Sequence, residues 1–115
     1  MAAQYNIVID QGATIDRVWT WYQADQVTPV NLTGFSAHMQ VRDRAGGTLL
    51  ADFSTAGGQI TLGGIAGTIT LTVPASATAA YGFDSGTYDL RMTDGAGNVT
   101  TLLAGLFVVN AAVTT

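Results

Sequence analysis

The only histidine in the chain, His38, is a candidate general base, because imidazole gains and loses a proton near neutral pH. It lies in Phe35 to Arg42, where apolar and polar side chains alternate, so we expect a strand with His38 on its solvent face. Nucleophilic catalysis would also need a hydroxyl at a strained turn, an orienting carboxylate and an oxyanion hole, and the sequence contains no Gly-x-Ser-x-Gly motif. We therefore predict no catalytic residue and a non-enzymatic protein.

The eight Asp residues could supply a carboxylate pair for glycoside hydrolysis or ligands for a metal. Most of them stand next to Gly, Arg or Ala in turn sequences, where Asp accepts hydrogen bonds from the nearby backbone. The segment from Asp94 to Asn98 looks like part of a calcium loop, but it lacks a third acidic ligand and the closing Glu. The sequence therefore predicts a tight turn held by Gly95 and Gly97, with no metal and no cofactor.

Trp19 and Trp21 are candidate binding residues of another kind. The segment Ile15 to Tyr22 is predicted to be a strand, and its period of two places both Trp residues on one face together with Arg17. With Tyr22 they could form an aromatic platform for sugar rings, although aromatic pairs on strands more often belong to a core or a protein interface. We therefore take Trp19 and Trp21 as candidate interface residues, with glycan binding as the alternative.

The composition is that of one globular domain spanning residues 1–115, with 48% hydrophobic and 10% charged residues. The apolar runs are too short to cross a bilayer, and a net charge of −4 with only four Arg leaves no basic surface for nucleic acid. Cysteine is absent from the sequence, which excludes disulfides and thiolate sites. The first residues lack the basic and apolar regions of a secretory signal, so we expect the product to stay in the cytoplasm where it is made.

Short stretches with a period of two, separated by Gly, Asn and Asp, predict an all-β fold. The predicted strands are Tyr5 to Asp10, Ile15 to Tyr22, Phe35 to Arg42, Thr48 to Phe53, Gln59 to Leu62, Thr68 to Val73, Thr87 to Thr93 and Val99 to Asn110. The last six of these form three hairpins in chain order, and Pro74 to Tyr81 is predicted to be one short helical turn. We expect an immunoglobulin-like antiparallel β-sandwich of about seven or eight strands, with a small barrel as the alternative.

Two stretches of the sequence resemble each other: MQVRDRAGGTLLADF from Met39 to Phe53, and LRMTDGAGNVTTLLAGLF from Leu90 to Phe107. Each is predicted to form a strand, an Asp-x-Ala-Gly turn and a second strand that contains Leu-Leu. The final strand of the second stretch differs, because it places apolar side chains on both of its faces. An exposed apolar face invites aggregation unless a partner covers it, so Leu106, Phe107 and Val108 are candidate interface residues.

Four segments of the chain resemble a pattern found in small phage and prophage proteins that are usually encoded near tail-fibre or baseplate genes. They are QGATIDRVWTWYQ, PVNLTGFSAHMQVRD, GGQITLGGIAGTITLTVPASATAA and GTYDLRMTDGAGNVTTLLAGLFVV, and the resemblance spans nearly the whole chain, from about Tyr5 to Val109. The pattern is also similar to the N-terminal domain of phage baseplate upper proteins, in which an extended strand, a Leu-Thr-Gly turn and a Tyr-Asp-Leu strand recur. Where that pattern carries apolar residues through the second strand, this chain has Arg17.

The resemblance implies a virion structural protein of a tailed bacteriophage, with no catalytic residues to carry over. It implies other virion proteins of the baseplate, tail fibre or capsid as partners, a homo-oligomeric or multi-copy arrangement, and a place in the virion after synthesis in the host cytoplasm. Membrane and nucleic acid are not expected as partners. The expected function is a baseplate or tail-fibre connector, with a capsid decoration protein of immunoglobulin-like fold and a glycan-binding adhesion module as the alternatives.

Overall fold

The computed structural model describes residues 3–111, and strands account for most of that length. In chain order the strands are β1 (Ala3–Gln4), β2 (Ile7–Asp10), β3 (Ile15–Thr20), β4 (Ser36–Arg42), β5 (Leu49–Ser54), β6 (Ile60–Leu62), β7 (Thr68–Val73), β8 (Ser85–Thr93) and β9 (Val99–Asn110). A 3₁₀ helix, η1 (Gly64–Ala66), joins β6 to β7, and a short α-helix, α1 (Ala75–Thr78), follows β7.

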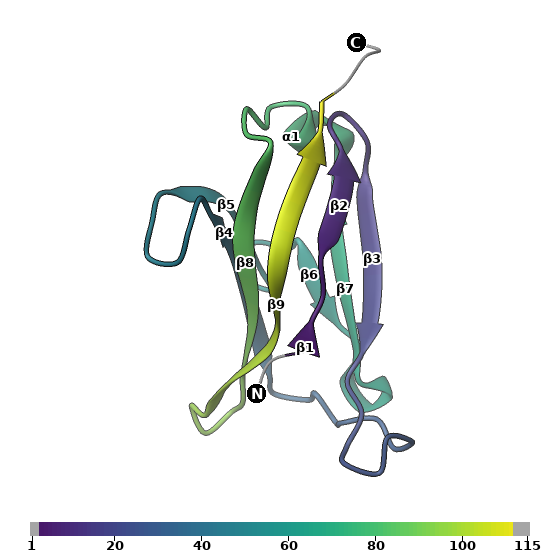
Figure 1. Cartoon of the computed structure of the whole chain (residues 1–115). Coiled ribbons are helices and arrows are strands. Elements are labelled where there is room, and N and C mark those ends of the chain that lie inside the picture. Colours follow the sequence, from purple (N-terminus) through teal and green to yellow (C-terminus); the bar gives the residue numbers. More distant parts are fainter. Residues whose placement is uncertain (1–2, 112–115) are drawn as a thin grey trace.

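Two sheets face each other in a β-sandwich (Figure 1). In the larger sheet β1 and β2 lie beside β9, which is followed by β8, β4 and β5, while the smaller sheet runs in the order β3, β7, β6. Between the sheets lies a core of aliphatic and aromatic side chains, in which Met39, Leu90 and Phe107 are fully buried. The prediction of an immunoglobulin-like β-sandwich is confirmed, and the pairing is antiparallel except at the N-terminal strands.

The alternation of side chains explains why these segments form sheet and not helix. In β4 the residues Ala37, Met39 and Val41 are buried, whereas Ser36 and His38 between them are exposed. The three predicted hairpins, β4–β5, β6–β7 and β8–β9, all form with antiparallel registers. The period of two therefore decides which side chains of each hairpin enter the core.

The N-terminal strand differs from the single predicted strand, Tyr5 to Asp10. Both β1 and β2 pair with β9 in parallel, and the ladder is interrupted between them. At the interruption a Cβ on Gly105 would overlap the carbonyl oxygen of Tyr5, so only glycine allows the two backbones to approach this closely. The hydroxyl of Tyr88 donates to the same carbonyl over 2.5 Å. Burial, with a smaller contribution from Tyr5, raises the pKa of Tyr88 to about 12.

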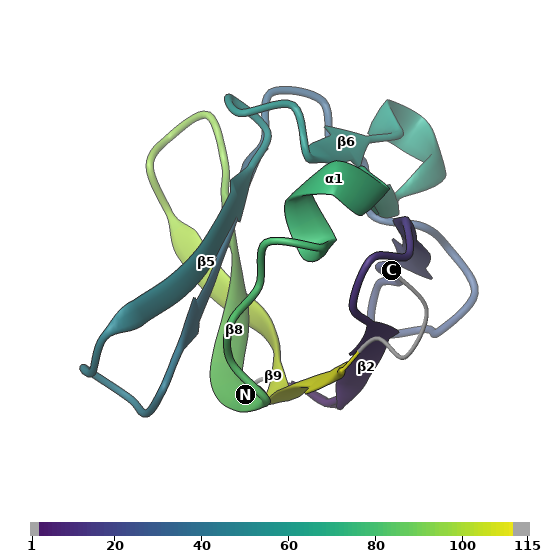
Figure 2. The ribbon, with the colours of Figure 1, turned by 90° about the horizontal axis from the view of Figure 1, so that it is seen from above.

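The two ends of the sandwich are closed differently. At one end α1 lies across the opening between the sheets (Figure 2), where the buried hydroxyl of Thr78 donates to the carbonyl of Ala13 over 2.7 Å. At the other end β3 stops at Thr20, two residues before its predicted end, and Tyr22 pairs with Pro29 in the loop that follows. None of the helices described between residues 3 and 111 has the length and apolar character to cross a bilayer.

Candidate interaction face

The outer face of the larger sheet is open, because the smaller sheet and α1 lie on its other side (Figure 2). Alternate residues of five strands point outward here. On β4, β5 and β8 they are mostly polar or charged, with Leu49 as an apolar exception: Ser36, His38, Gln40, Arg42, Asp52, Ser54, Thr87, Asp89 and Arg91. On β9 and β2 they are apolar along the middle of the strands, at Ala104, Leu106, Val108 and Val8, and polar at the end, at Asp10 and Asn110. The outer face therefore has a charged half and an apolar half.

A shallow cavity of about 400 Å³ lies in the charged half. Its charged lining comes from Arg42, Asp89 and Arg91, and the turn after β4 adds Ala45 and Gly46 as a wall. Figure 1 shows this β4–β5 hairpin extending away from the body of the sandwich. Arg42 donates to a carbonyl of the turn over 2.8 Å, and Nε of Arg91 lies 3.6 Å from a carboxylate oxygen of Asp89. The cavity therefore presents two arginines and one carboxylate side by side to a polar or charged group.

His38 has an acidic partner that the sequence analysis missed. Its Nε2 lies 2.5 Å from Oδ1 of Asp52 on β5, and both side chains are about half exposed. The signal was present in the hairpin register: His38 pairs with Ser54, which makes Asp52 its diagonal neighbour on the same face. The hydroxyl of Ser54 accepts a hydrogen bond from the N–H of Gly57 over 2.9 Å. Among the hydrogen bonds described for residues 3–111, that of His38 is with Asp52.

The last strand, β9, has apolar residues on both faces, and the two faces have different surroundings. Phe107 is fully buried, which corrects its place among the candidate interface residues: it belongs to the core. Leu106 is 52% exposed on the outer face, and Val108 is partly exposed beside it. Val8 of β2 pairs with Val108 and is also exposed, although the sequence analysis did not single it out. We call Val8, Leu106 and Val108 the apolar strip.

Trp19 and Trp21 pack against neighbouring rings at the edge and end of the sandwich. The ring of Trp19 meets Tyr5 edge-on with centroids 5.8 Å apart, and that of Trp21 meets Phe35 edge-on at 6.0 Å. Both Trp residues are partly buried against the core, whereas Tyr22 is exposed in the loop beyond β3. The two Trp residues therefore contribute to packing, and they do not join Tyr22 in the single aromatic platform that was the alternative to an interface role.

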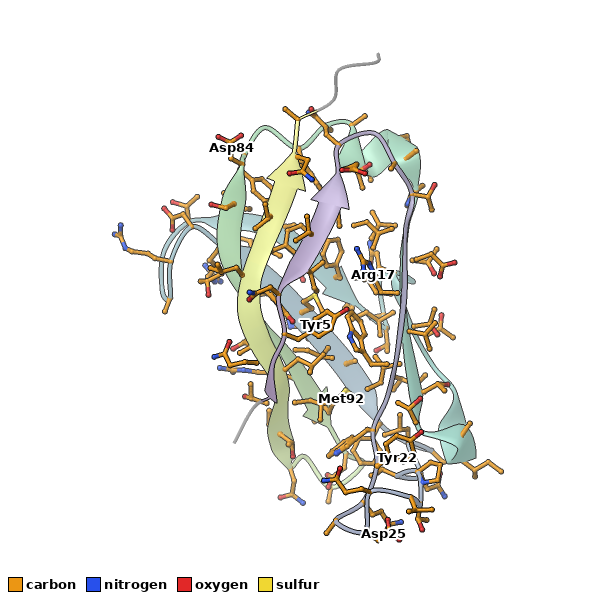
Figure 3. The ribbon with its side chains drawn as sticks, turned by 45° about the vertical axis from the view of Figure 1, so that its right-hand side comes forward. Tyr5, Arg17, Tyr22, Asp25, Asp84 and Met92 are labelled. Atoms are coloured by element: carbon orange, nitrogen blue, oxygen red, sulfur yellow. The ribbon has the colours of Figure 1, made fainter. Side chains whose placement is uncertain are left out.

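Arg17 joins the two sheets at the edge where β2 and β3 lie side by side without a shared ladder (Figure 3). Its guanidinium donates to the carbonyl of Val8 over 2.6 Å. The departure from the apolar pattern of the second strand thus has a structural use, because the long side chain satisfies a backbone acceptor that the open edge would leave unpaired.

The turn between β8 and β9 uses its carboxylate to hold the backbone. Asp94 accepts hydrogen bonds from the N–H groups of Ala96 and Asn98, each over 2.9 Å, and from the Asn98 amide. The bonds from Asn98 lower the pKa of Asp94 below its ordinary value. Of the two predicted turn glycines, Gly97 adopts a positive φ of 91° and Gly95 does not. In the described part of the chain, no group of three or more His, Cys, Asp or Glu is placed to hold a metal.

No family model matches the sequence, and no curated protein matches it. Among solved structures, the chain is similar to extracellular domains 3–5 of Drosophila OTK, with 17% sequence identity and a TM-score of 0.38. The match covers 90% of this chain and 31% of that chain, so this chain spans less than a third of its length. A likeness at this TM-score carries no argument about function.

Proposed function

We propose that the chain is a non-enzymatic structural module of a tailed-bacteriophage virion, which joins baseplate or tail-fibre proteins through the outer face of its larger sheet. The observation that carries the proposal is the apolar strip of Val8, Leu106 and Val108. An exposed apolar strip beside a polar surface is typical of a protein interface. The phage context rests on the resemblance of the sequence to small virion proteins.

The setting of the apolar strip supports a docking role. β9 is paired on both sides, by β8 and by the N-terminal strands, so Leu106 and Val108 are presented on a rigid surface. The neighbouring cavity offers charged groups that would add specificity to an apolar contact. The His38 and Asp52 pair adds a polar contact to the same face.

The substitution Leu106→Asp tests the proposal, because it places a charge in the middle of the apolar strip. Leu106 is half exposed, so the circular dichroism spectrum and the melting temperature should stay close to those of the wild type. The protein should disappear from purified particles, as measured by mass spectrometry. Val18→Asp is the matched control, since Val18 is 60% exposed on β3 of the other sheet, and this variant should be incorporated normally.

Two results would count against the proposal in different ways. Absence of the wild-type protein from particles made by the phage or prophage that encodes it would refute the virion role. Normal incorporation of a folded Leu106→Asp variant would keep the virion role and remove the outer face as the docking surface.

A further inference from the structure

The outer face is close to balanced in charge, although the chain as a whole is acidic. Arg42 and Arg91 stand there with Asp52, Asp89 and, at the end of β2, Asp10, so the face carries one net negative charge. In the hairpin turn beside this face, one negative and one positive side chain cancel. The remaining charged side chains are Arg17, Asp16, Asp25, Asp84 and Asp94. One positive charge against four negative charges places three of the four net negative charges outside the outer face.

The charged half and the apolar half of this face adjoin each other in register. Thr87 of β8, which lines the cavity, pairs with Leu106, and Asp89 pairs with Ala104. A partner that covers the apolar strip therefore also reaches the arginines and carboxylates. That partner must carry apolar side chains next to charges of both signs.

We infer that a second copy of this chain is such a partner, and that two copies pack outer face against outer face about a twofold axis. A twofold contact pairs each surface with itself, so a self-complementary surface is required. This face supplies both an arginine and a carboxylate for its counterpart, together with an apolar strip. The exposed face of the smaller sheet carries Asp16 on β3 with no arginine beside it on its described strands, so pairing that face with itself would bring two carboxylates together. The inference deepens the proposed function by naming a partner for the same face.

The size of the face places this contact among small interfaces. Five strands about 4.8 Å apart and some seven residues long at about 3.3 Å each cover roughly 20 by 23 Å. Two such faces bury on the order of 1,000 Å² in total, which is at the low end for a specific interface. We therefore expect a weak dimer, with a Kd in roughly the micromolar range.

Sedimentation velocity from about 1 µM to about 1 mM tests the inference, because this range brackets the expected Kd. The wild-type chain should pass from monomer to dimer as its concentration rises. Leu106→Asp and Arg91→Gln should each raise the Kd at least about tenfold, whereas Val18→Asp should leave it unchanged. All three substitutions make the net charge more negative by one unit, so a difference between them reports position and not overall charge. Circular dichroism establishes that each variant is folded, and Arg91→Gln carries the test alone if Leu106→Asp does not fold.

Several results would overturn the inference. These are a wild-type chain that stays monomeric throughout, a dimer that neither outer-face variant weakens, a dimer that Val18→Asp weakens equally, and growth into larger oligomers without a closed dimer. The proposed function fails separately. If the protein is monomeric and its Leu106→Asp variant is lost from particles, the virion role stands and the dimer is refuted. If the protein dimerises but is absent from particles, the dimer stands and the virion role is refuted.

Discussion

The hairpins β4–β5 and β8–β9 have similar sequences and different places in the fold. Each contains an Asp-x-Ala-Gly turn and a strand with Leu-Leu. The strand order β5, β4, β8, β9 is symmetric about the β4–β8 pair, where Met39 and Leu90, the first residues of the two similar stretches, pair with each other. Yet β5 is an edge of the sheet, whereas β9 is enclosed by β8 and the N-terminal strands. Local sequence therefore forms the hairpin, and its place in the sheet decides what the hairpin does.

The two turns are built alike. The carboxylate of Asp43 accepts a backbone N–H from five residues later over 2.9 Å, and that of Asp94 accepts one from four residues later over 2.9 Å. Gly46 and Gly97 both adopt a positive φ, of 74° and 91°. These interactions join residues that are close in sequence, so the same turn chemistry works at both places in the fold.

The second strands differ where their neighbours differ. Asp52 follows Leu-Leu-Ala in β5 and faces solvent at the sheet edge, whereas Gly105 follows Leu-Leu-Ala in β9 and lies against the backbone of Tyr5. One residue later in β5, and two later in β9, Phe53 and Phe107 both point into the core, and their rings meet with centroids 6.2 Å apart. The core position of the phenylalanine is thus common to both strands, whereas the residue after Leu-Leu-Ala differs with the neighbour that each strand has in the sheet.

Truncation of the two core phenylalanines should give the largest effect. Phe107→Ala is expected to cost about 3 to 5 kcal/mol of unfolding free energy, because a fully buried ring is removed from the middle of the core. Phe53→Ala should cost about 1 kcal/mol less, because an edge strand can relax into the cavity more easily. Urea unfolding of both variants measures the difference. An equal or larger loss for Phe53→Ala would show that the edge strand is as constrained as the central one.

Gly105→Ala should give the next largest effect, because its Cβ would meet the Tyr5 carbonyl and push the N-terminal strand away from β9. Crowding of this kind costs about 1 to 3 kcal/mol, and hydrogen exchange should increase in β1 and β2 before the rest of the sheet. The control is Gly82→Ala, where a Cβ meets nothing within 4 Å, and which should stay within about 0.5 kcal/mol of the wild type. Unchanged protection of β2 in Gly105→Ala would contradict the proposed role of this glycine.

Alanine in the two turns should have a smaller and equal effect. Gly46→Ala and Gly97→Ala each force a side chain into the left-handed region in open space, which costs about 1 kcal/mol. Thermal unfolding of both variants under the same conditions tests whether the turns are equivalent. A loss at one turn at least about twice that at the other would mean that tertiary contacts support one of them.

The smallest effect concerns pH. The pKa of Asp94 is lower in the folded protein than in the unfolded chain, so its carboxylate stabilises the fold above the unfolded pKa of about 4. This contribution is lost as the pH falls through the lower folded pKa, and Asp94→Asn should therefore reduce the loss of stability on acidification. Melting temperatures between about pH 2 and pH 6 measure the change. An NMR titration midpoint for the Asp94 carboxyl at or above the ordinary Asp value would contradict it.

The sequence by itself determined the three hairpins and the side chains that their strands bury. The alternation in Phe35 to Arg42 and in Thr87 to Thr93, together with the Asp and Gly residues of the turns, acts over a few residues, so each hairpin was predictable in isolation. The same local reasoning placed Gly97 in the turn, where its φ is positive. It also identified Leu106 as an apolar residue of a strand that is apolar on both faces.

Only the tertiary structure decided which neighbour covers each face and edge. A period of two divides β9 into two faces, but the packing of the sheets places Phe107 in the core and leaves Leu106 exposed. The parallel pairing of β2 with β9 joins segments far apart in the chain. The packing of Trp19 on Tyr5 joins β3 of the smaller sheet to the N-terminal segment between β1 and β2. The pairing of His38 with Asp52 required the register across a hairpin. Such contacts depend on how the elements assemble, because the alternation of apolar and polar residues in a strand does not specify which segments lie beside it.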